Sequence, residues 1–136
     1  MQPPAPKTVM VLEPDVIVRA EISEFLRQCG FVVIEGVDAE DLRTALDSGT
    51  AIDVVLAEIQ LKGSVSGFEL AQKVRQTRPE IAVILVSSID NVVERATDLC
   101  GRGPVKKPYH SDEILRRIRV LTGLRDRMDK SAGKKE

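Results

Sequence analysis

The sequence predicts an α/β fold in which a doubly wound, five-stranded parallel sheet is covered by helices on both faces, as a three-layer sandwich. Short runs of β-branched and apolar residues alternate along the chain with longer segments of helical period. The short runs are almost continuously apolar, as strands of a parallel sheet buried on both faces are. A chain of 136 residues with 43% hydrophobic residues is long enough for one core. One compact domain is therefore expected.

Five β-α units account for this alternation. The strands are expected to begin near residues 8, 31, 53, 81 and 104, at "TVMVL", "FVVI", "DVVLA", "IAVILV" and the weaker "PVK". Between and after them, apolar residues recur at helical spacing within 18–29, 39–46, 68–74, 92–99 and 114–121. Gly30 stands where the first helix should stop, Asp38 and Ser111 stand where N-caps belong, and Pro79 closes the third helix. Right-handed crossovers leave few ways to wind such a sheet.

The ends of the chain differ in composition from the middle. Residues 1–7, "MQPPAPK", are rich in proline, and residues 125–136, "RDRMDKSAGKKE", are polar and charged. Both are expected to be flexible tails around a single domain at residues 8–124. No residues then remain for a DNA-binding or enzymatic output domain.

Neither the net charge nor the apolar segments favour a nucleic-acid or membrane partner. The 20 basic and 21 acidic residues nearly cancel, so net charge gives no reason to expect binding to nucleic acid or to a membrane surface. The longest apolar run, "IAVILV", is far shorter than a membrane span, and the first residues lack the apolar core of a signal peptide. A cytoplasmic location is expected.

Polar residues follow four of the predicted strands at the edge where parallel sheets collect ligands and chemistry. These residues are Glu13 and Asp15 after the first strand, Glu58 after the third, Ser87 after the fourth and Lys107 after the fifth. Each one alone has an ordinary structural explanation, since acids cap helices and lysines line edges. Their common position predicts a site.

The residues around these positions resemble the receiver domain of two-component response regulators, the CheY-like family. The resemblance rests on "VMVLEPD", "DVVLAEIQLKGSVSGFEL", "VILVSS" and "VKKPY", taken in this order, and it covers residues 8–124. It implies a flavodoxin-like (βα)5 fold. It also implies transfer of a phosphoryl group from a histidine kinase to an aspartate with Mg²⁺, followed by a change in a partner-binding surface.

The resemblance assigns a role to each site residue. Glu58 takes the position of the phosphoacceptor, and Glu13 that of the first metal-binding acid. Ser87 takes that of the switch hydroxyl, and Lys107 that of the lysine that contacts the phosphoryl oxygens. By this assignment Lys107 is expected to pair with Glu58, and a hydrogen bond from Ser87 to Glu58 is the weaker expectation.

Four departures from the family pattern fall on this functional surface. Glu58 replaces the aspartate, Pro14 replaces a second acid, Lys62 replaces the loop proline, and Pro104 replaces the aromatic switch residue. Asp15, beside Pro14, is a candidate to compensate for the missing acid. The apolar core pattern is intact, which suggests a fold kept while its phosphorylation chemistry relaxed.

The longer side chain at Glu58 bears directly on acyl-phosphate formation. One added methylene moves the carboxylate by roughly 1.5 Å, and misplacement by about 1 Å can slow a positioned reaction on the order of a hundredfold. Mg²⁺ demands near-octahedral oxygen ligands. Without an acid at Pro14 it would rely on Glu13, Glu58 and the backbone carbonyl of Gln60, so weak or absent binding is expected.

Three functions follow from these observations. The preferred one is a single-domain atypical receiver that signals through protein contacts with impaired phosphorylation. Its partners would be a histidine kinase, a phosphotransfer protein or a downstream protein, and homodimerisation is left open. The second is a conventional receiver that accepts phosphate on Glu58 or Asp15. The third is a small flavodoxin-like enzyme or ligand-binding protein, for which no nucleophile with a paired base is evident.

Overall fold

The structure is a computed structural model, and it describes the backbone of residues 5–87, 105–106 and 111–133. Side chains are described for residues 5–87 and 112–123. The helix expected over residues 92–99 lies outside these ranges, as do Pro104 and Lys107. The expectations for those residues stay predictions.

A parallel sheet forms the centre of the molecule. Its long strands are β1 (Thr8–Leu12), β2 (Val32–Gly36), β3 (Val54–Glu58) and β4 (Ala82–Ser87), and β5 consists of Val105–Lys106 alone. The spatial order is β2-β1-β3-β4-β5, and every neighbouring pair is parallel. The four long strands begin within one residue of the predicted positions. The winding reverses between β1 and β3, which is the switch point of a doubly wound sheet.

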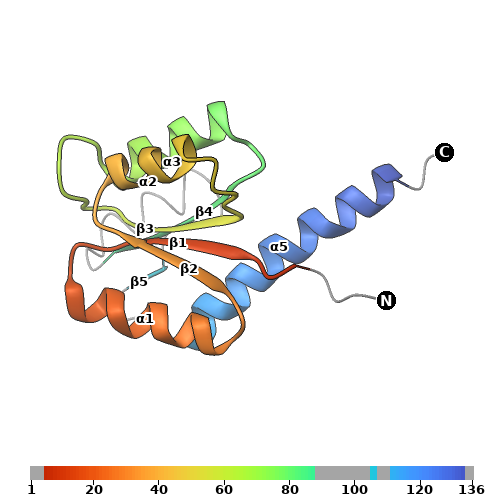
Figure 1. Cartoon of the computed structure of the whole chain (residues 1–136), viewed down its shortest axis with the longest axis horizontal. Helices are drawn as coiled ribbons and strands as arrows, with labels where there is room; N and C mark the ends of the chain where they lie inside the picture. Colours follow the sequence, from red (N-terminus) through yellow and green to blue (C-terminus); the bar gives the residue numbers. More distant parts are fainter. Residues whose placement is uncertain (1–4, 88–104, 107–110, 134–136) are drawn as a thin grey trace.

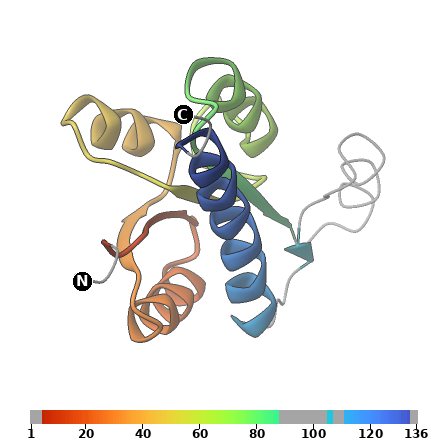
Figure 2. The same ribbon diagram turned by 90° about the vertical axis from the view of Figure 1, so that its right-hand side faces the viewer.

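Helices cover both faces of this sheet. They are α1 (Val16–Gln28), α2 (Ala39–Asp47), α3 (Gly67–Thr77) and α5 (Ser111–Gly133). Figure 1 shows α1 and α5 on one side of the sheet and α2 and α3 on the other, and Figure 2 shows the same layers from the side. The predicted three-layer α/β sandwich is confirmed.

The helix ends follow from local sequence. Asp38 is the N-cap of α2, and its Oδ1 accepts a hydrogen bond from the N–H of Asp41 at 2.9 Å. Gly30 follows α1 with φ of +96°, a backbone conformation that glycine adopts without strain. Helix α3 ends at Thr77, two residues before Pro79. The predicted cap at Asp38 and the stops at Gly30 and Pro79 are confirmed, whereas Ser111 is the first residue of α5 rather than a cap outside it.

The last helix is longer than the composition predicts. Helix α5 has 23 residues, and its backbone stays helical to Gly133, into the segment predicted as a tail. The boundary at residue 124 stays a prediction. Within the described ranges, no helix is both long and apolar enough to cross a membrane.

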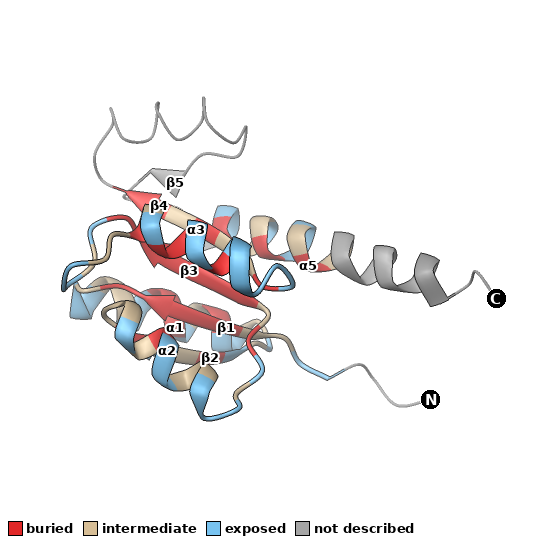
Figure 3. Cartoon of the chain, turned by 90° about the horizontal axis from the view of Figure 1, so that it is seen from above, coloured by how far each residue is buried: buried red, intermediate tan, exposed pale blue. Residues whose placement is uncertain are grey.

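The core has two halves, one on each side of the sheet, because successive strand residues point to opposite faces. Val9 and Val11 of β1 belong to the half under α1 and α5, while Met10 and Leu12 belong to the half under α2 and α3. Figure 3 shows that the central strands are almost entirely buried. The burial on both faces explains their continuous apolar sequences.

Candidate functional site

Three of the predicted site residues meet at the carboxyl end of the sheet. The pairing of Leu12 with Ala57 carries β1 and β3 forward to Glu13 and Glu58, and Glu58 in turn pairs with Val86 of β4, one residue before Ser87. The exposed fractions are 3% for Glu13, 5% for Glu58 and 0% for Ser87. The topology therefore brings two buried carboxylates and a buried hydroxyl to one edge, at the switch point.

Glu58 is held against the loop that follows it. Its Oε1 accepts a hydrogen bond from the N–H of Gln60 at 3.2 Å. The next residue, Ile59, donates its N–H to the carbonyl of Val86 and accepts a hydrogen bond at 2.7 Å from the N–H of Gly67. A Cβ at Gly67 would lie 2.6 Å from the carbonyl oxygen of Glu58. The start of α3 is therefore pressed against the end of β3, which fixes the backbone of Glu58.

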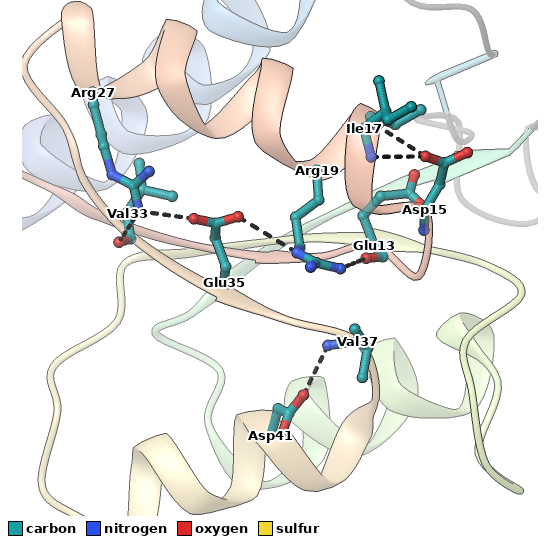
Figure 4. Close-up of polar contacts among 10 residues, drawn as sticks. Glu13, Asp15, Ile17, Arg19, Arg27, Val33, Glu35, Val37 and Asp41 are labelled. Carbon is teal, nitrogen blue, oxygen red and sulfur yellow. Dashed lines mark hydrogen bonds and ion pairs between the residues drawn. The ribbon is translucent and has the colours of Figure 1, made fainter.

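Glu13 and Asp15 have different roles in the structure. The Oε2 of Glu13 accepts a hydrogen bond from the N–H of Asp15 at 3.0 Å. Asp15 is exposed and is the N-cap of α1, with its Oδ1 accepting from the N–H groups of Ile17 and Val18 (Figure 4). One carboxylate oxygen of Asp15 is thus already used to cap a helix. Its assignment as a substitute for the missing second acid stays a prediction.

An ion-pair cluster behind Glu13 was not anticipated from the sequence. Arg19 of α1 donates to the backbone carbonyl of Glu13 at 2.8 Å, and its Nε lies 3.4 Å from Glu35 of β2. Arg27 contacts the other oxygen of Glu35 at 3.1 Å (Figure 4). The cluster joins α1 to β1 and β2, so it supports the backbone that carries Glu13. The signal in the sequence was a glutamate inside an otherwise apolar strand.

The departure at Lys62 has a structural correlate. The N–H of Lys62 donates to the carbonyl of Val37 at 3.4 Å, and Lys62 forms an isolated parallel bridge with Asp38. Proline, the residue expected here from the resemblance, has no N–H and could not donate. The loop after β3 is thereby joined to the loop after β2.

The predicted metal ligands do not form a full acidic cage in the described part of the chain. No group of three or more His, Cys, Asp or Glu side chains there is arranged to hold a metal ion. The edge offers the carboxylates of Glu13 and Glu58, and each already accepts a backbone hydrogen bond. Pro14 contributes no carboxylate. The residues therefore do not fit a three-acid Mg²⁺ site.

The two switch residues differ in what the structure describes. Ser87 ends β4 and is fully buried, so its hydroxyl does not face solvent. Its hydrogen bond to Glu58 stays a prediction. Lys107 lies outside the described residues, and its ion pair with Glu58 stays a prediction as well.

This chain is similar to known proteins in both sequence and fold. Residues 9–119 match the model of the response regulator receiver domain. The chain is 30% identical to a cyclic di-GMP phosphodiesterase of Thermotoga maritima over 123 residues, which cover 89% of the chain and 32% of the relative. It is 31% identical to the regulatory protein VirG of Agrobacterium fabrum, over 88% of the chain and 47% of VirG. The chain thus spans a third to a half of the length of these relatives.

Solved structures agree with this assignment. The BeF3-activated receiver domain of DrrB from Thermotoga maritima aligns with a TM-score of 0.72 and 26% identity, over 87% of this chain and 98% of the other. A receiver domain protein from Clostridium thermocellum aligns with a TM-score of 0.77 over 90% and 98%, and at 18% identity it supports the fold alone. With a family match over most of its length and a flavodoxin-like sheet that gathers Glu13, Glu58 and Ser87 at one edge, the chain belongs to the response regulator receiver domains of two-component signalling.

Proposed function

We propose that this chain is an atypical receiver in which Glu58 accepts phosphate poorly and which signals through protein contacts. The observation that carries the proposal is the placement of Glu58. It ends β3 at the switch point, is 5% exposed, and has its Oε1 turned back to the N–H of Gln60. A buried carboxylate held by its own loop is a poor candidate for in-line attack on an incoming phosphoryl group.

The argument on rate is geometric. Phosphoryl transfer depends almost entirely on positioning and on charge stabilisation. The extra methylene of Glu58 displaces the nucleophilic oxygen by roughly 1.5 Å. The hydrogen bonds of Ile59 with Val86 and Gly67 leave the backbone beside Glu58 little freedom to absorb this shift. Loss of about a hundredfold or more in rate is expected relative to an aspartate at the same position.

Weak Mg²⁺ binding is a second part of the proposal. Glu13, Glu58 and the carbonyl of Gln60 would supply the protein oxygens, and Pro14 would supply none. Asp15 is committed to α1 through Oδ1. Mg²⁺ tolerates poor geometry badly and gives up its waters reluctantly. A dissociation constant well above that of a three-acid site is expected.

The proposed partners are a histidine kinase, a phosphotransfer protein or a downstream target, reached in the cytoplasm, with homodimerisation left open. The relatives act as a regulatory protein and a phosphodiesterase, by their names, but the chain covers less than half of each. Their whole activities are not carried over. The alternative is a conventional receiver that accepts phosphate on Glu58 or Asp15.

Exposure to acetyl phosphate and Mg²⁺, followed by intact-mass measurement, tests the proposal. The chain should remain unmodified, and a peptide map should find no phosphoryl group on Glu58 or Asp15. A phosphoryl adduct in good yield on either residue would instead show that the chain is a conventional, phosphate-accepting receiver. Glu58→Asp is the matched control, because it shortens the side chain and leaves the loop sequence unchanged.

Rescue separates the contributions of Glu58 and Pro14. Glu58→Asp alone should restore labelling only in part, since the metal site still lacks an acid. The double variant with Glu58→Asp and Pro14→Asp should be phosphorylated faster, and at a lower Mg²⁺ concentration. Equal labelling of the two variants would show that Pro14 has no part in the impairment.

A further inference from the structure

A groove separate from the acidic edge, the carboxyl end of the sheet where Glu13, Glu58 and Ser87 lie, opens between α2 and α3. It has a volume of about 440 Å³ and is bounded by α2, α3 and residues 62–65 of the loop after β3. Glu13, Glu58 and Ser87 are not among its lining residues. Both helices lie on the same face of the sheet, as Figures 1 and 2 show. Its size falls within the range of about 300–1,000 Å³ typical of small-molecule sites.

Two matching helical stripes form the long walls of this groove. On α2 the stripe has the spacing i, i+3, i+4, i+7, and on α3 the spacing is the same. The members are Ala39, Leu42, Arg43 and Leu46 on α2, and Leu70, Lys73, Val74 and Thr77 on α3. Each stripe therefore has apolar side chains and one cation, Arg43 on α2 and Lys73 on α3, and α2 also lines the groove with Glu40 and Asp47.

The floor of the groove is apolar. Leu42, Leu70 and Val74 are 2–4% exposed and belong to the core, while Leu46 and Val65 are partly exposed against it. A ligand in the groove would thus remove partly exposed aliphatic surface from water, which favours an apolar body.

The charges of the rim favour an anionic group. Four cations line the groove, Arg43, Lys62, Lys73 and Arg78, against three acids, Asp38, Glu40 and Asp47. Glu40 already pairs with Arg43, Asp38 caps α2, and Asp47 is the one remaining acid among the lining residues. In the described part of the chain, Lys62, Lys73 and Arg78 have no carboxylate within ion-pair distance. Cations without a paired acid beside an apolar floor complement a ligand that has both characters.

We propose that this groove binds a small amphipathic molecule with an apolar ring or chain and one carboxylate or similar anionic group. The apolar part contacts Leu46, Val65 and Val74, and the anionic group meets Lys73 and Lys62. The site does not depend on phosphorylation of Glu58. Its ligand contacts the loop that begins directly after Glu58, because Lys62 and Val65 are part of that loop.

Titration with 1-naphthaleneacetate, followed by amide chemical shifts of the full ¹⁵N-labelled chain, tests this site. The neutral analogue 1-naphthaleneacetamide has the same ring and lacks the charge, so the pair isolates the anionic group. Saturable shifts are expected at Leu46, Val65 and Val74, and the neutral analogue should bind about fivefold more weakly. Equal affinity for the two probes, or shifts confined to other surfaces, would overturn the proposal.

Two substitutions on α3 sharpen the result. Lys73→Glu places a negative charge in the groove and should weaken 1-naphthaleneacetate binding about tenfold. Arg75→Glu makes the same change at an exposed residue on the same helix that does not line the groove, and binding should stay within about twofold. Both side chains are exposed, so both variants should fold. An equal loss in both variants would reduce the effect to net charge and refute the site.

Discussion

The two faces of the sheet are packed to different degrees. Under α1 and α5, the residues Ile22, Leu26, Ile114 and Ile118 are at most 1% exposed. The ion pairs of Arg19 and Arg27 with Glu35 also tie α1 to the edge strand β2. Over the other face, α2 and α3 leave a groove of about 440 Å³ between them. The face under α1 and α5, here called the closed face, is the more tightly packed of the two. The face under α2 and α3, the open face, leaves surface for a ligand.

Truncation of a leucine on each face should give the largest contrast. Leu26 is 0% exposed, and Leu26→Ala should lower the free energy of unfolding by about 3 kcal/mol, because it leaves a cavity in a close-packed region. Leu46 lines the groove and is partly exposed, so Leu46→Ala should cost about 1 kcal/mol. Urea denaturation measures both. Equal losses would show that the two faces are packed alike.

Substitution of Gly67 tests whether the start of α3 is fixed in place where it meets the end of β3. A Cβ there would lie 2.6 Å from the carbonyl oxygen of Glu58 and 2.7 Å from the Cα of Ile59, both backbone atoms. Gly67→Ala should therefore destabilise the fold by about 2 kcal/mol. In α5, a Cβ at Gly123 meets nothing within 4 Å. Gly123→Ala should raise stability by about 0.5–1 kcal/mol, and thermal unfolding of both variants should show opposite signs.

Removal of the Glu35 charge measures how far the ion pairs hold the closed face. Glu35→Gln should lower stability by about 1 kcal/mol, because one carboxylate contacts two arginines in a partly buried cluster. Glu40→Gln, which breaks only the exposed pair with Arg43, should cost about 0.3 kcal/mol. Both effects should shrink in 1 M salt. A loss at Glu35 that salt leaves unchanged would assign it to packing instead.

The last contrast concerns two buried hydroxyls. Ser23 in α1 is 0% exposed, and its Oγ has no hydrogen-bond partner among the residues that the structure describes. Ser23→Ala should therefore be neutral or stabilise the protein by up to about 1 kcal/mol. Thr122 in α5 is also buried but donates to the carbonyl of Ile118 at 2.8 Å. Thr122→Val should cost about 0.5 kcal/mol, and a loss of stability in Ser23→Ala would contradict the contrast.

The sequence predicted the sheet well because each strand carries its own signal. The starts of β1 to β4 fall within one residue of the expected positions, and the cap at Asp38 and the stop at Gly30 are where local rules place them. Right-handed crossovers and burial on both faces leave few possible strand orders, and the structure shows which one is adopted. The approach of Glu13, Glu58 and Ser87 to one edge is a consequence of that topology.

Features that join distant segments were missed. The cluster of Arg19, Glu35 and Arg27 depends on how α1 crosses β2, and no sequence period encodes that contact. The groove between α2 and α3 depends in the same way on the spacing of two helices. Asp15 is an N-cap, the role that its position directly before an amphipathic helix favours. Its role as an acid of the site stays a prediction.

The length of α5 has a consequence for how the molecule tumbles. A helix of 23 residues is about 34 Å long, and Figure 1 shows its second half projecting from the sheet as a rod. A globule with such a rod rotates more slowly about axes perpendicular to the rod than about the rod itself. The N–H bonds of α5 lie nearly parallel to the rod, so only the slower rotation reorients them, while the N–H bonds of the sheet take other orientations. Amide ¹⁵N relaxation should therefore give α5 a longer apparent correlation time than the strands.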